Sequence, residues 1–158
     1  MMKAFNLFDN VAWVGPVCGS NAVTTMQASR PEDMEPIEVS GHLSGYCFLT
    51  KKSIYDELGY FDEDFCFYGQ ESDWIDRVFE INKYQKKDYK ITIAPRAHVV
   101  HGYDGEGSQA AKQAEQEEHM DTGEDSQYSY LCWNFKKMRR LEKYDVKYEF
   151  PEYNGYGE

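Results

Sequence analysis

Hydrophobic positions along the chain form short continuous runs in some places and a helical spacing in others. The run Val11–Gly15, ended by Pro16, predicts one buried strand, and the run Tyr46–Thr50 predicts another. A helix over 71–84 is predicted by a stripe of apolar residues at helical spacing, namely Trp74, Ile75, Val78 and Ile81. Between the first two runs, residues 31–43 contain two prolines and four acids and indicate a loop.

The remaining elements follow from the same patterns. Residues 51–58 predict a helix closed by Gly59, since glycine commonly ends a helix. Two strands are expected on either side of Pro95, Lys90–Ala94 and Ala97–His101. Because strands and helices alternate, the sequence predicts an α/β fold, with a mixed sheet flanked by helices.

The last third of the chain divides into two stretches. Residues 102–126 almost lack large apolar side chains and predict a flexible flap, with a short helix over 109–119 inside it. Residues 127–143 predict a C-terminal helix whose buried side carries Leu131, Phe135 and Met138. Its basic run at 136–140, KKMRR, indicates a solvated face, with an anion or a membrane surface as the alternative partner.

Length and composition exclude several classes of protein. The 158 residues fit a single domain, 1–158, and 16% aromatic residues are too many for a disordered chain. A formal charge of −11 argues against a nucleic-acid partner. The sequence has no run long enough for a transmembrane segment and no secretory signal, so a cytoplasmic location is expected. Four cysteines without a C-x-x-C pair are expected to be buried free thiols.

An acidic cluster is the first candidate for chemistry. Five carboxylates lie within twelve residues, at Asp62, Glu63, Asp64, Glu71 and Asp73. A carboxylate beside a helix start can act as a general base if it reaches a substrate hydroxyl. The alternative is a helix cap followed by a solvated acidic turn. Asp73 and Arg77 also have the spacing of an ion pair on the surface of a helix.

Histidines and glycines supply the other candidates. His98 and His101 face opposite sides of an extended chain, so the pair is not expected to share a metal. One of them could be a ligand or a hydrogen-bond donor, but a single histidine without a paired ligand is more often an ordinary packed or surface residue. The run 102–108, GYDGEGS, permits close backbone approach to a ligand but lacks the lysine of a phosphate-binding loop. A flexible connector explains this run as well.

The order of these pieces resembles the C-terminal, acceptor-side half of inverting family-2 glycosyltransferases of the GT-A fold. The resemblance covers about 11–108 and lies in motifs that occur in the family's order: Val14-Gly15-Pro16, Ser44-Gly45-Tyr46, the turn Gly59-Tyr60-Phe61-Asp62-Glu63-Asp64-Phe65, the segment Gly69-Gln70-Glu71-Ser72-Asp73 with Arg77, and Ala94-Pro95-Arg96-Ala97-His98-Val99-Val100-His101. It implies a hexosyltransferase-type enzyme with a nucleotide-sugar donor and a carbohydrate acceptor.

The resemblance also implies roles for particular residues. Glu71 falls at the position of the catalytic base, where the family usually carries Asp, and Gln70 replaces the acid before it. Asp73, Arg77, Asp62 and Glu63 fall at substrate-binding positions. His101 falls where related enzymes hold a divalent metal, Mn²⁺ or Mg²⁺, which supports the diphosphate leaving group. The implied reaction is a one-step inverting displacement, with the flap closing over the donor.

Family members carry a nucleotide-binding half with a D-x-D motif upstream of these segments. Ten residues precede the first matched strand, and Asp9 stands there without a second Asp. The sequence therefore predicts a truncated glycosyltransferase, with a partner chain or a second copy covering the missing half. The alternative is a non-catalytic, self-associating remnant that binds a glycan or a partner. A glycosidase that uses Glu71 and Asp73 is a third hypothesis, which requires two carboxyl groups about 5–9.5 Å apart across a sugar cleft.

Overall fold

A computed structural model gives the fold of the chain. It describes residues 1–18, 25–28, 34–65, 69–99 and 122–152, without the side chains of 25 and 122–126. The described elements follow in the order α1 (Ala4–Leu7), β1 (Val11–Cys18), the 3-10 turn η1 (Thr25–Gln27), β2 (Ile37–Val39), α2 (Lys52–Leu58), α3 (Gln70–Gln85), β3 (Lys90–Val99) and α5 (Thr122–Glu142).

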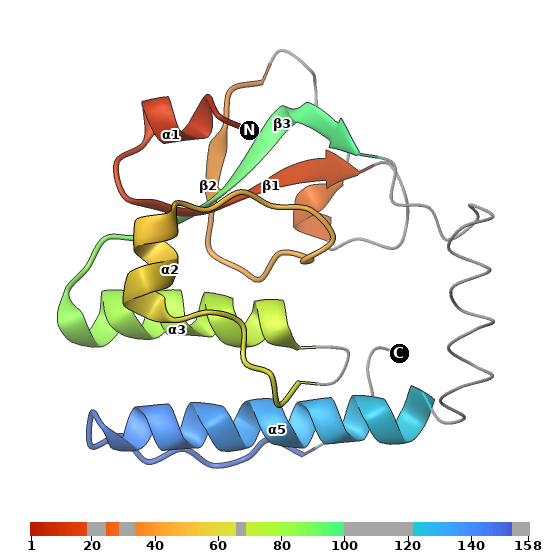
Figure 1. Cartoon of the computed structure of the whole chain (residues 1–158), viewed down its shortest axis with the longest axis vertical. Helices are drawn as coiled ribbons and strands as arrows, with labels where there is room; N and C mark the ends of the chain where they lie inside the picture. The colour runs from red at the N-terminus through yellow and green to blue at the C-terminus, as the bar shows by residue number, and fades with distance from the viewer. Residues whose placement is uncertain (19–24, 29–33, 66–68, 100–121, 153–158) are drawn as a thin grey trace.

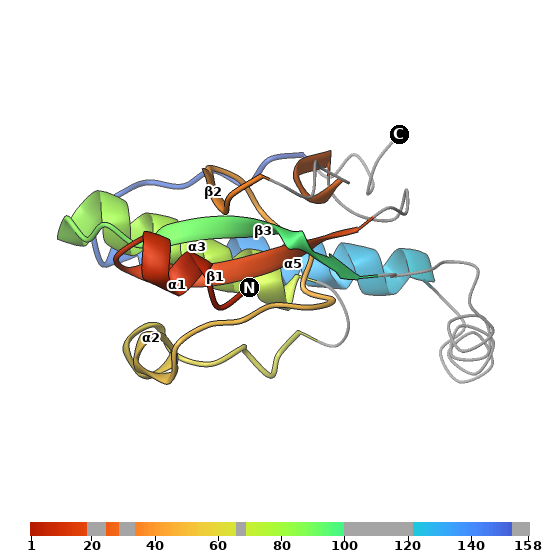
Figure 2. The ribbon, with the colours of Figure 1, turned by 90° about the horizontal axis from the view of Figure 1, so that it is seen from above.

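These elements form layers. The small sheet lies at the top of Figure 1, α3 runs beneath it, and α5 runs beneath α3. Seen from above, α2 lies to one side of the sheet, in front of α3 and α5 in the first view (Figure 2). The expectation of an α/β fold with a mixed sheet flanked by helices is confirmed, since β1 pairs parallel to β3 and β2 pairs antiparallel to it.

Pro16 lies within β1 and Pro95 within β3, whereas the sequence predicted that each would interrupt a strand. The strand order is β1-β3-β2, so β1 is an edge strand. Proline has no backbone N–H, and an edge strand tolerates Pro16 because the sheet does not need a hydrogen bond from that position. On the central strand β3, Ala94 pairs with Pro16 but Val17 pairs with His98, which leaves a bulge around Pro95. Residues 90–99 are therefore one bulged strand. The run 46–50 forms only an isolated bridge from Leu49 to Val14, and the expected loop 31–43 contains β2.

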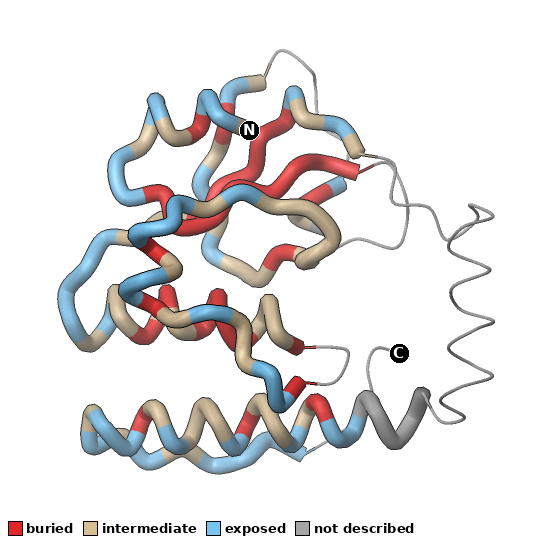
Figure 3. Tube along the Cα trace, viewed as in Figure 1, coloured by how far each residue is buried: buried red, intermediate tan, exposed pale blue. Residues whose placement is uncertain are grey.

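The main core lies between the sheet and the upper face of α3. All eight residues of β1 are buried, and Trp13 stacks on Phe48 with ring centroids 3.9 Å apart. The predicted apolar stripe of α3 supplies Trp74, Ile75 and Val78, each 0% exposed. Burial of aliphatic side chains such as Val78 contributes roughly 1.5–3 kcal/mol each to folding. The tube in Figure 3 shows this burial concentrated in β1, β3 and the sheet-facing turns of α3.

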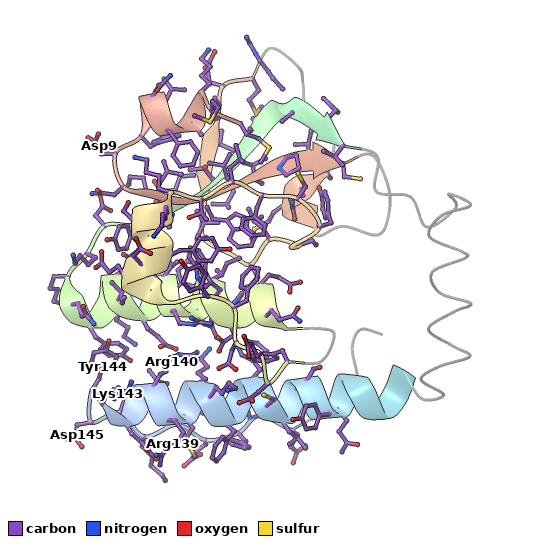
Figure 4. All side chains as sticks on the ribbon, in the orientation of Figure 1. Asp9, Arg139, Arg140, Lys143, Tyr144 and Asp145 are labelled. Atoms are coloured by element: carbon purple, nitrogen blue, oxygen red, sulfur yellow. The ribbon has the colours of Figure 1, made fainter. Side chains whose placement is uncertain are left out.

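The orientation expected for the C-terminal helix is wrong. Helix α5 begins five residues before the predicted start at 127, and two of the three side chains expected to be buried lie outside, Leu131 at 47% and Phe135 at 54% exposed. The basic run instead turns inward, because Lys137 and Arg140 meet acids of α3. Figure 4 shows Arg140 between the two helices.

Three further expectations concern the cysteines, the flap at 102–126 and membrane-spanning helices. Cys18 is buried, Cys47 and Cys132 are half-buried, and none of these three forms a disulfide, whereas Cys66 lies outside the described residues. The flap at 102–126 falls almost wholly outside them as well, apart from the first turn of α5. In the described part of the chain, no helix combines the length and the apolar character needed to cross a bilayer.

Candidate functional site

Glu71, the predicted base, lies in the first turn of α3. The chain enters this helix through Gly69 at φ +96°, a left-handed conformation that glycine adopts without steric penalty. The side chain of Gln70 reaches back to donate a hydrogen bond to the carbonyl oxygen of Phe65, 3.1 Å away. Glu71 is half-buried, and its carboxylate has no hydrogen bond or ion pair within the described residues.

Gly45 packs directly against the Glu71 side chain. A Cβ atom at position 45 would lie 3.0 Å from Cβ of Glu71 and 3.3 Å from its Cδ. The turn that carries Gly45 is held by the fully buried Gln27, whose Oε1 accepts the Ser44 N–H at 2.6 Å. Gln27 also donates to the Tyr46 hydroxyl at 3.3 Å. A buried amide thus fixes the turn, and the turn fixes the space available to Glu71.

Asp73 and Arg77 join α3 to the turn that follows α2. Arg77 donates to Oδ2 of Asp73 through Nε at 3.0 Å and Nη2 at 2.7 Å. Its remaining nitrogen, Nη1, donates to the carbonyl oxygens of Leu58 and Tyr60. The predicted ion pair is confirmed, but Asp73 is 1% exposed, so the pair is buried rather than on the surface.

Arg140 of α5 closes the same cluster from the other side. Its Nη1 lies 2.5 Å from Oδ1 of Asp73, and its Nε and Nη2 hold both oxygens of Glu80, at 2.8 and 3.1 Å. Burial raises the pKa of the Glu80 carboxyl, and the neighbouring guanidinium only partly offsets this. Helix α5 is therefore attached to α3 through a buried, bidentate arginine–carboxylate contact.

Asp76, one turn along α3, gathers three donors. His42 lies 3.0 Å from its Oδ1, while the Trp133 indole and Lys137 each donate to Oδ2 at 2.9 Å. Burial pushes the pKa of this carboxyl upward, but the hydrogen bonds from His42 and Lys137 outweigh it, so the pKa lies below the usual value. Asp76 thus stays ionised and links α3, α5 and the loop after β2.

A pocket of about 610 Å³ opens between α5 and the segment that follows α2. Its lining combines eight charged side chains with four others: Leu58, Asp62, Asp64, Asp73, Arg77, Tyr128, Cys132, Phe135, Lys136, Arg139, Arg140 and Lys143. Three of the four residues predicted to bind substrate, Asp62, Asp73 and Arg77, meet here. Glu63 is exposed on the neighbouring turn, and neither Glu63 nor Glu71 is part of the described lining.

The acids at the mouth of this pocket are paired. Lys136 lies 2.5 Å from Asp62 and 2.6 Å from Asp64. Burial pushes the pKa of the Asp62 carboxyl upward, but the Lys136 ammonium and the Asp64 backbone N–H hold it below its ordinary value. The sequence expectation of a solvated acidic turn is thereby only half met, since Asp64 is exposed but bound to α5.

The predicted metal ligand, His101, lies outside the described residues, as does the GYDGEGS run. His98 is exposed at the end of β3. Within the described ranges, no three His, Cys, Asp or Glu side chains gather closely enough to hold a metal ion. This part of the chain alone therefore does not provide a metal site, and metal binding at His101 stays a prediction.

Sequence reasoning missed Gly45 and Arg140 as site residues. One signal for Arg140 was present: Asp73, Asp76 and Glu80 stand at i, i+3 and i+7 and form an acidic stripe down α3. The basic run of α5 is its complement in charge. No comparable signal marks Gly45, because its contact with Glu71 depends on how distant segments meet.

Part of the chain is similar in sequence to curated glycosyltransferases. The similar proteins are N-acetylglucosaminyl-diphospho-decaprenol L-rhamnosyltransferases of Mycobacterium tuberculosis, strains CDC 1551 / Oshkosh and ATCC 25618 / H37Rv, each 35% identical over 91 residues. The alignment covers 57% of this chain and spans only 27% of the length of those relatives. No family model and no solved structure matches the chain.

Proposed function

We propose that this chain is the acceptor-side part of a sugar transferase of the GT-A fold, acting on a nucleotide-sugar donor and a carbohydrate acceptor. The observation that carries the proposal is the 35% identity over 91 residues to proteins named as rhamnosyltransferases. The α/β architecture and the position of Glu71 at the start of α3 are compatible with it.

Glu71 is the proposed base. Its carboxylate would take the proton from an acceptor hydroxyl while the hydroxyl oxygen bonds to the anomeric carbon of the donor. The bond between that carbon and the diphosphate breaks in the same step, which inverts the configuration. A positioned general base contributes roughly 10²–10⁴-fold to such a rate. The half-buried carboxylate beside Gly45, which has no partner among the described residues, supports this role.

The proposed substrate-binding residues act in two ways. Asp73 and Arg77 are committed to each other in the pocket lining, so they hold α3 to the turn after α2 instead of offering free groups. Asp62, at the mouth, and Glu63, exposed beside it, are the residues nearer to solvent that we propose to contact the saccharide. We also propose Mn²⁺ or Mg²⁺ at His101, although no step above passes through the metal.

Nucleoside diphosphate release tests the proposal. The full chain is incubated with nucleotide-sugars and saccharide acceptors, with and without Mn²⁺. We expect Glu71→Gln to lower the rate at least a hundredfold and Glu71→Asp to retain part of it. The matched control is Glu149→Gln, which makes the same change at a carboxylate whose side chain is 79% exposed and lies outside the pocket lining. Equal rates for Glu71→Gln and the unsubstituted chain would rule out the base assignment.

A non-catalytic, self-associating protein is the second candidate, and one observation favours it. Tyr128, Leu131 and Phe135 expose 47–54% of their surface along α5, where apolar side chains normally find a partner. Sedimentation over a range of concentrations, on the full chain and on Leu131→Asp, tests this alternative. A dimer that Leu131→Asp dissociates, together with no turnover, supports the second candidate over the first.

A further inference from the structure

One stripe of α5 side chains lines the pocket, and it changes from mainly aromatic to cationic along the helix. Tyr128, Cys132 and Phe135 form its first half, and Arg139 and Lys143 continue it at the same helical spacing. Tyr128 and Phe135 are 51% and 54% exposed, so their ring faces are accessible. The stripe therefore offers an apolar, aromatic surface followed immediately by two cations.

The charges in the pocket do not cancel. Its lining contains five cationic and three anionic side chains, in a chain whose net charge is −11. All three carboxylates are already paired, Asp62 and Asp64 with Lys136 and Asp73 with Arg77 and Arg140. The surplus cations are the two at the end of the stripe.

Arg139 and Lys143 are available to a ligand. Arg139 makes a single 3.3 Å contact with Glu142, in which both side chains are more than half exposed. Such a pair contributes only about 0–1 kcal/mol, so an anion can displace it. Lys143 has no ion pair or hydrogen bond through its side chain within the described residues. Figure 4 labels both residues at the C-terminal end of α5, Lys143 above the helix near Arg140 and Arg139 below it.

We propose that this pocket binds a phosphorylated saccharide, with the phosphoryl group on Arg139 and Lys143 and the sugar ring over Phe135. A guanidinium matches two phosphate oxygens at once, and the ammonium adds a second positive charge. The apolar C–H face of a sugar suits the electron-rich face of an aromatic ring. Four residues of α5, a rise of about 6 Å along the helix axis, separate Phe135 from Arg139, which is the scale of one sugar ring.

The proposed ligand depends on the proposed function in one respect: the group attached to the phosphate is taken to be a saccharide because the chain is proposed to be a sugar transferase. Glu71 does not belong to the described lining, and a residue two positions from Asp73 points to a different side of α3. Binding at Arg139 and Lys143 therefore stands or falls separately from proton transfer at Glu71.

Calorimetry with the full chain tests the site, using glucose 1-phosphate, inorganic phosphate and glucose as probes. We expect glucose 1-phosphate to bind most tightly and glucose least, with affinity falling as salt is raised. Lys143→Gln and Arg139→Gln should each weaken glucose 1-phosphate roughly three- to tenfold. Lys147→Gln, the same change at an exposed lysine outside the pocket, should alter it less than twofold.

Two further variants separate the parts of the proposal. Phe135→Ala should weaken glucose 1-phosphate but leave inorganic phosphate unchanged, whereas Glu71→Gln should leave both unchanged. The inference is overturned if Lys143→Gln, Arg139→Gln and Lys147→Gln behave alike, which would mean that the cations serve only the C-terminal dipole of α5. It is also overturned if phosphatidylcholine vesicles with phosphatidic acid bind the chain while glucose 1-phosphate does not, since the partner is then a membrane surface.

Discussion

Replacing Arg140 by Met tests whether α5 is held to α3 by buried charge. Methionine keeps much of the length of the arginine side chain but removes every donor. Asp73 then loses the partner of Oδ1 and keeps Arg77 on Oδ2, whereas Glu80 loses the donors to both of its oxygens. The side chain of Glu80 is only 8% exposed, so water cannot fully replace the guanidinium.

The expected loss of stability follows from Glu80. Removing one partner of a buried ion pair commonly costs about 3–5 kcal/mol. Glu80 can limit this by taking up a proton, and its reference pKa is 4.5. Because each pH unit above the reference pKa corresponds to about 1.4 kcal/mol, protonation at pH 7 requires about 3.4 kcal/mol. We therefore expect Arg140→Met to lower the free energy of unfolding by about 3 kcal/mol at pH 7.

The same reasoning fixes the pH dependence. In the variant, folded Glu80 holds a proton that the unfolded chain has released, so the folded state gains stability as the pH falls toward 4.5. The difference in free energy of unfolding between Arg140→Met and the unsubstituted chain should therefore shrink to about 1 kcal/mol at pH 5.

Urea denaturation of both chains at pH 7 and pH 5 measures these values. The control is Arg139→Met, the same substitution one residue earlier, where the side chain is 66% exposed and the expected loss is below about 0.5 kcal/mol. Equal losses for the two variants would refute the argument, as would an Arg140→Met difference that stays constant between the two pH values.

Two further predictions concern Gly45 and Asp76. Gly45→Ala places a methyl group 3.0 Å from Cβ of Glu71. We therefore expect the rate of diphosphate release to fall about a hundredfold, while the free energy of unfolding changes by less than about 1.5 kcal/mol. A normal rate in a folded variant would contradict the packing argument. Asp76→Asn should lower the free energy of unfolding by about 2 kcal/mol at pH 7. Because the pKa of Asp76 is depressed in the folded state, this contribution is present above pH 3.8 and is lost as the pH falls through the folded value. Urea denaturation at pH 7 and pH 3 checks this, and a difference in the free energy of unfolding that does not shrink between the two pH values would contradict it.

The sequence predicted helices better than strands, for a physical reason. Helix α3 presents an apolar stripe from Trp74 to Ile81, about two turns long, which is a strong local signal. Gly59 and Gly69 mark the ends of the segment before this helix. Whether a proline ends a strand depends on its neighbours in the sheet. Pro16 is tolerated because β1 is an edge strand, a fact that no local pattern contains.

The order of motifs predicted where Glu71 lies, at the start of a helix, but not what surrounds it. The contacts of Glu71 with Gly45 and of Asp73 with Arg140 join segments far apart in the chain. The outward position of Phe135 was mispredicted for a related reason. An apolar side chain is normally assigned to the core, but α3 presents Asp73, Asp76 and Glu80 to α5, and these acids attract the cations of α5 instead.

Helix α3 is held on one face by apolar packing and on the other by ion pairs, and the two kinds of interaction depend differently on temperature. Its sheet side, at Trp74, Ile75 and Val78, is apolar, so its contribution weakens on cooling. Its α5 side carries ion pairs, whose desolvation penalty decreases as temperature rises. Cold therefore loosens the sheet from α3 before it loosens α5, and warming favours the charged layer relative to the apolar one.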